Sequence, residues 1–120
     1  MRQIPDDLRI DIAFLVFAAR TRQFPSYTEH GRLRNNSARG HQNKLEAVNQ
    51  WCRDNGFPQL ATLVCKAGTT MPDLTGFTGP QWQANYPGWN AARVREEQQA
   101  CLGANWDYML KTLREELKAA

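Results

Sequence analysis

The cysteines are the most nucleophilic side chains in the sequence, and Cys65 has the most suggestive neighbours. It follows a short apolar run and precedes Lys66, whose charge would lower the pKa of the thiol and so favour a nucleophile. The alternative is a small buried hydrophobic residue, which is the usual role of a free cysteine. Cys52 and Cys101 fall at positions expected in helix cores. An odd count of three cysteines without a CxxC pair predicts a reducing, cytoplasmic environment rather than a disulfide framework.

The histidines and carboxylates form no recognisable catalytic or metal-binding set. His30 and His41 are not joined by cysteines or acids at the close spacing of a zinc site, so no metal or cofactor is expected. His30 is expected on an exposed helix surface or as a neutral hydrogen-bonding group. The common phosphate-binding, dinucleotide-binding, metalloprotease and serine-hydrolase motifs are absent from the sequence. No catalytic residues are therefore predicted, and an enzyme that uses Cys65 is the lesser alternative.

Positive charge is concentrated in one window of the chain. The net charge of the 120 residues is +3, but the window 20–44 holds six basic residues and one acidic residue, a local charge of +5. Such a patch can attract phosphates even when the whole protein is close to neutral. The side chains predicted to contact nucleic acid are Arg32, Arg34, Arg39, Gln42, Asn43 and Lys44. The alternative is a solvated surface whose charge serves solubility.

A first helix is expected before this window, over about residues 5–22. Pro5 and the two acids after it are typical of a helix start. Apolar residues recur at helical spacing along one side of this segment. Because Phe14 and Phe17 add a second apolar side, the helix is predicted to be well buried.

Two further helices are expected to hold the charged window itself. Ser26 can cap a short helix over 27–33, with Glu29 completing a capping box. After a turn, a longer amphipathic helix is predicted over about 38–55, ended by Asn55-Gly56. The positive charge would then lie at the turn and at the start of the longer helix.

Short strands and two more helices are predicted after that. The apolar, partly β-branched run 60–66 is typical of a strand, and residues 74–77 could pair back on it as a hairpin. Asn90 can cap a helix over 91–102, and a last helix is expected over about 104–119. The length and the order of elements predict a single domain of the mainly α (α+β) class. Its expected core is a winged helix-turn-helix with a small β-hairpin over about 5–80, followed by a C-terminal helical part over about 81–120.

About half of the chain resembles the winged-helix domain of alkylguanine-DNA alkyltransferases and alkyltransferase-like proteins. The residues that carry the resemblance are Ser26-Tyr27, Arg39-Gly40, Cys65 and Gly76-Phe77. The resemblance implies a winged-helix fold and DNA as the partner. The Pro-Cys-His-Arg active site of the family is missing, because Val64, Lys66 and Ala67 replace its proline, histidine and arginine. Methyl transfer is not implied, since the thiolate of that family needs the histidine for activation.

The main prediction is a small non-enzymatic protein that binds nucleic acid, as a regulatory or phage accessory protein. The alternative is a protein-interaction module or inhibitor of a host protein. Its predicted surface comprises Trp82, Tyr86 and Trp89 together with the last helix, because Trp and Tyr are enriched at binding hot spots. Those aromatic side chains could instead pack the C-terminal helices onto the core.

The N-terminal segment carries no signature of export or membrane insertion. Its apolar run, residues 12–19, is too short to span a bilayer. Three acids, Asp6, Asp7 and Asp11, and the lack of a small-residue cleavage site are unlike a signal peptide. A cytoplasmic protein without a membrane partner is therefore expected.

Overall fold

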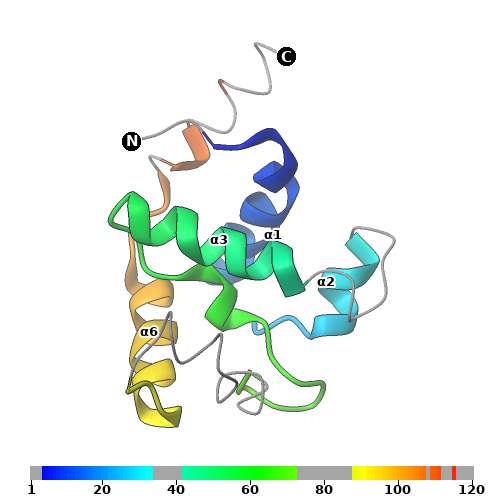
Figure 1. The fold of residues 1–120 in the computed structure, drawn as a ribbon, viewed down its shortest axis with the longest axis vertical. Helices are drawn as coiled ribbons and strands as arrows, with labels where there is room; N and C mark the ends of the chain where they lie inside the picture. The colour runs from blue at the N-terminus through cyan, green and yellow to red at the C-terminus, as the bar shows by residue number, and fades with distance from the viewer. Residues whose placement is uncertain (1–3, 34–41, 73–87, 108, 112–114, 116–120) are drawn as a thin grey trace.

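A computed structural model describes residues 4–33, 42–72, 88–107, 109–111 and 115 of the chain, and this part is mainly helical (Figure 1). The elements are η1 (Asp6–Leu8), α1 (Arg9–Arg20), α2 (Tyr27–Leu33), α3 (Gln42–Asp54), η2 (Leu60–Leu63) and α6 (Ala91–Gly103), where η marks a 3-10 helix. Helical residues follow at 107, 109–111 and 115. None of the helices in the described ranges is long and apolar enough to cross a membrane.

The winged helix-turn-helix prediction is wrong for the described residues, because they contain no strand. Residues 60–63 form η2, and the nearest feature to a sheet is an isolated parallel bridge between Ser26 and Cys65. The second strand predicted over 74–77 lies outside the described residues.

Side chains from other helices explain why this apolar run does not form a strand. The Asn49 side chain of α3 accepts a hydrogen bond from the Ala61 amide at 2.9 Å. Gln98 of α6 donates its side-chain amide to the Thr62 carbonyl at 2.8 Å. The Thr62 hydroxyl also donates to the Gln59 carbonyl at 2.7 Å, which closes the turn. A buried backbone must satisfy its polar groups, and here side chains do so in place of a neighbouring strand.

The predicted helix ends are confirmed where local signals set them. The Ser26 hydroxyl accepts from the Glu29 amide at 3.1 Å, and the Ser26 amide donates to the Glu29 carboxylate at 3.3 Å, which is the capping box expected for α2. Asn90 caps α6 by accepting from the Arg93 amide at 3.0 Å. Gly56, with φ of +75°, follows the end of α3.

The C-terminal end of α1 has the hydrogen bonds of a Schellman motif. The Arg22 amide donates to the Ala19 carbonyl at 3.3 Å, and the Gln23 amide donates to the Ala18 carbonyl at 2.8 Å. This motif places one residue in the left-handed region, a position that usually holds glycine. Here that residue is Arg22, with φ of +56°, and it is the only described residue other than glycine with a positive φ.

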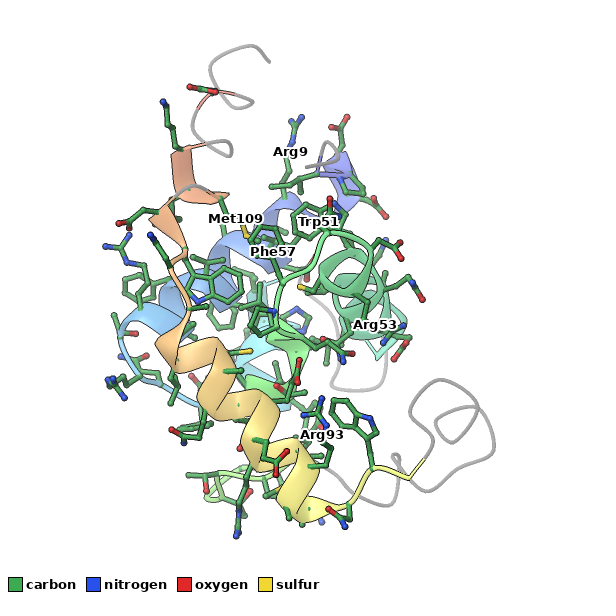
Figure 2. The ribbon with its side chains drawn as sticks, turned by 90° about the vertical axis from the view of Figure 1, so that its left-hand side faces the viewer. Arg9, Trp51, Arg53, Phe57, Arg93 and Met109 are labelled. Carbon is green, nitrogen blue, oxygen red and sulfur yellow. The ribbon has the colours of Figure 1, made fainter. Side chains whose placement is uncertain are left out.

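The core is organised around η2, which packs against α1, α3 and α6. Every residue of η2 is buried. Phe57 stacks between Trp51 and Trp106, with ring centroids 5.7 Å apart in both pairs. Figure 2 shows Trp51 and Phe57 at this position, with Met109 close by in the same view. The helical residues after position 90 therefore share one core with the N-terminal helices. The largest fully buried side chains are those of Trp106, Ile4, Ile12, Leu15, Leu60, Leu63, Met109, His30, Val16 and Val48.

Candidate interaction surface

Cys65 lies in an environment that keeps its thiol protonated. It is fully buried, and its Sγ donates to the Leu63 carbonyl at 3.2 Å. Burial raises the pKa of the thiol to about 12, although a hydrogen bond from Gln98 at 3.7 Å opposes the rise. Lys66 is exposed and is not among the causes of the shift. Burial likewise raises the pKa of Cys52 to about 12 and that of Cys101 above its usual range. These thiols match the buried hydrophobic role that sequence analysis gave as the alternative.

A buried pair of polar side chains, Asp11 and His30, joins α1 to α2. The Nε2 of His30 lies 2.6 Å from Oδ1 of Asp11, and both side chains are fully buried. The Phe14 ring lies next to the imidazole, with centroids 6.2 Å apart. His30 is therefore not on an exposed helix surface, and its imidazole is instead a buried hydrogen-bonding group. We assign the pair a structural role, since a buried carboxylate is stable only with hydrogen-bonding partners.

The described part of the basic window is partly neutralised by acids from distant parts of the chain. Lys44 lies in α3 and makes an ion pair with Asp7 of η1 at 2.7 Å. Arg20 makes one with Asp107 at 3.3 Å. Arg32 is exposed at the C-terminal end of α2. Gln42 and Asn43 begin α3, whereas Arg34 and Arg39 lie outside the described residues, as does His41. Two of the window's cations therefore already have acidic partners.

The predicted aromatic surface is represented only by Trp89, because Trp82 and Tyr86 lie outside the described residues. The guanidinium of Arg93 lies 4.1 Å from the centre of the Trp89 ring, a cation–π contact. Arg93 also makes an ion pair with Glu97 at 2.9 Å (Figure 2 labels Arg93 on α6). Trp89 is half-buried and already packed on α6, so it covers this helix at its N-terminal end.

The outward side of α1 carries an apolar surface, which we call the α1 outer face and define by Ile10, Ala13, Phe14 and Phe17. Phe17 is 60% exposed and Ile10 is 48% exposed, and they are the exposed large hydrophobic residues of the described chain. Ala13 is exposed and Phe14 is half-buried. The spacing i, i+3, i+4, i+7 places the four residues on one side of a helix. The prediction that Phe14 and Phe17 add a buried second side is therefore wrong for Phe17, whereas Phe14 packs partly against the core.

Charged residues of opposite sign lie at the two ends of α1. Asp6 and Asp7 precede the helix, and their side chains are largely exposed although each makes an ion pair. Arg20 and Arg22 lie at its C-terminal end and are exposed. Arg20 is paired with Asp107, whereas Arg22 has no ion-pair partner within the described ranges. The charges of Asp6, Asp7 and Arg20 are therefore partly neutralised within the chain.

Two sequence signals would have indicated these features. Asp11 stands within an apolar run on the side of α1 that enters the core, so it requires a buried partner. The helix also carries apolar residues beyond the side that enters the core, among them Ile10 and Phe17, which its spacing identifies and which the packing leaves exposed.

Comparison with known proteins adds no relative. No protein-family model matches the chain, and no curated protein or solved structure matches it. Among the described residues, no three histidine, cysteine or acidic side chains come together as a metal site.

Proposed function

We propose that the protein is a protein-interaction module whose α1 outer face docks into a shallow apolar groove on another protein. The observation that carries this proposal is the exposure of Phe17 and Ile10, at 60% and 48%, on a helix whose opposite side forms the core. A modulator of host machinery, as the sequence suggested, would act through such a face.

Helix spacing supports a groove as the binding partner of this face. Side chains at i, i+3, i+4 and i+7 are the anchors with which a helix enters an apolar groove. Full burial of a Phe or Ile side chain contributes about 1.5–3 kcal/mol, so covering the exposed half of each would contribute roughly 1–2 kcal/mol per residue. A rigid helix held by its own core also loses little conformational entropy on binding, which favours affinity.

Nucleic-acid binding through the basic window stays a prediction with weaker support. Phosphate binding depends on Lys and Arg side chains that are free to neutralise phosphates and so displace the counterions condensed on the nucleic acid. Lys44 and Arg20 instead make ion pairs with Asp7 and Asp107. The winged helix that would have placed α3 in a major groove is also absent from the described residues. We therefore propose the interaction module ahead of a nucleic-acid-binding protein.

Site-specific photocrosslinking tests the proposal in the native cell extract. A photoreactive phenylalanine analogue at position 17 should form an adduct with one protein, which mass spectrometry identifies. The same analogue at Gln99, exposed on α6, is the control position. The identified protein is then produced pure, and its affinity for the chain is measured by calorimetry.

Two alanines provide a matched pair of variants for the affinity measurement. Ala13 lies within the α1 outer face, and Ala100 is an exposed alanine of α6. Ala13→Glu places a carboxylate in the interface and should weaken binding at least ten-fold, whereas Ala100→Glu should leave affinity unchanged. Equal effects of the two variants, equal adducts at positions 17 and 99, or adducts only with a second copy of the chain would each overturn the proposal.

A further inference from the structure

We infer that the groove bound by the α1 outer face ends in acidic side chains, and that Arg22 binds them. The inference rests on the proposed function and adds the charge of the partner and the direction of docking. In this arrangement the C-terminal end of α1 meets the acidic end of the groove. Complementary charge at the rim of an interface fixes orientation and speeds association.

The first observation is the position that Arg22 occupies in the chain. Thr21 follows α1, and its amide and hydroxyl both donate to the Phe17 carbonyl, at 3.0 and 2.8 Å. The backbone that leads into Arg22 is therefore hydrogen-bonded to Phe17, the most exposed residue of the α1 outer face. Arg22 is also exposed, so its side chain can reach a molecule that covers Phe17.

The second observation is the backbone conformation of Arg22. A φ of +56° at the end of a Schellman motif favours glycine, and a long side chain there is strained. Strained residues persist where function requires the side chain. Arg22 is exposed, so nothing in the described core explains why arginine stands at this position.

The third observation is the difference between the two arginines at this end of α1. The Arg20 guanidinium is engaged by Asp107 at 3.3 Å. Arg22 has no such partner in the part of the chain that the structure describes, so its charge is available to another molecule. An arginine is suited to this role because its planar guanidinium binds carboxylates in a bidentate manner.

A stability measurement tests the backbone argument without any partner. Arg22→Gly should raise the Tm of the chain by about 2–5 °C, because glycine adopts the left-handed conformation without strain. Arg22→Gln, which removes the charge and keeps a long side chain, should leave the Tm nearly unchanged. A Tm for Arg22→Gly at or below that of the natural chain would overturn the argument that strain is retained for function.

A binding measurement tests the charge argument with the protein identified by crosslinking at position 17. Arg22→Gln should slow association roughly ten-fold and flatten the dependence of the association rate on salt, measured at about 50 and 300 mM NaCl. The control is Arg95→Gln, which removes one charge from an exposed position on α6. It should change neither quantity.

The two proposals fail in different ways. Loss of binding by Ala13→Glu together with no effect of Arg22→Gln would leave the interaction module in place and overturn the acidic groove. Equal slowing by Arg22→Gln and Arg95→Gln would also overturn it, since the effect would then come from net charge alone. If Ala13→Glu and Ala100→Glu bind alike, the α1 outer face is not the interface, and both proposals fall.

Discussion

Removing His30 should destabilise the fold more than any other change to the buried pair. His30→Leu conserves most of the side-chain volume but removes the nitrogen that lies 2.6 Å from the Asp11 carboxylate. Both side chains are fully buried, so water does not replace the lost contact in the native packing. Loss of one partner of a buried pair of this kind costs about 3–5 kcal/mol. That is a large fraction of the roughly 5–15 kcal/mol that stabilises a typical domain.

Changing Asp11 instead should cost less, and the double change should recover stability. Asp11→Asn keeps an oxygen that can accept from His30, so we expect a loss of about 1–2 kcal/mol. In His30→Leu, adding Asp11→Asn replaces a buried carboxylate with a neutral amide, whose burial costs less. The double variant should therefore be more stable than His30→Leu alone by at least about 1 kcal/mol.

Urea unfolding, followed by the fluorescence of the buried Trp51 and Trp106, measures these differences. An unchanged m-value for each variant is the control that the native state remains compact. A loss below about 1 kcal/mol for His30→Leu would show that the pair is not a structural element of the fold. A double variant that is less stable than His30→Leu would refute the argument that the cost comes from the buried carboxylate.

Four further predictions concern the thiols, the cap of α2 and a surface ion pair. A thiol reagent at pH 7 should label the protein only after urea unfolding. The reason is that burial raises the pKa of all three thiols, those of Cys52, Cys65 and Cys101. Rapid labelling of the native protein would contradict this. For the same reason the contribution of the thiols to stability should be constant below pH 9. It should fall as pH rises from 9.0, the ordinary thiol pKa, towards 12, by up to about 1.4 kcal/mol per pH unit per thiol. A urea midpoint that is equal at pH 8 and pH 10 would refute this. Ser26→Ala should lower the free energy of unfolding, measured in urea, by about 1 kcal/mol, because the capping box is lost. Lys44→Ala should lower it by less than about 1 kcal/mol, because the ion pair of Lys44 lies at the surface.

The parts of the fold that local signals control could be predicted from the sequence. The capping box at Ser26, the cap at Asn90 and the helix end at Gly56 all depend on hydrogen bonds or dihedral angles within a few residues. Local interactions of this kind do not depend on the rest of the chain. Their positions were therefore predicted correctly, even though the fold class was not.

The conformation of 60–66 could not be predicted, because distant side chains decide it. A short apolar, β-branched run is typical of a strand, but Asn49 and Gln98 reach its backbone from α3 and α6. Separation in sequence also explains why the charge of the basic window was overestimated. Its Lys44 makes an ion pair with Asp7, which lies far away in the sequence. The candidate surface was missed for a different reason. Hydrophobic spacing shows that α1 has two apolar sides, but only the packing shows which of them the core covers.

The bridge between Ser26 and Cys65 has a consequence for the order in which the protein folds during synthesis. The Tyr27 amide donates to the Cys65 carbonyl at 3.2 Å, and the Cys65 amide donates to the Pro25 carbonyl at 2.9 Å. The segment that leads into α2 is thus held by a residue that leaves the ribosome only after all of α3. Until then the start of α2 lacks these two hydrogen bonds. A nascent chain that ends before residue 65 would carry the α1 outer face on a scaffold that is not yet assembled, so recognition through that face would await translation of the centre of the core.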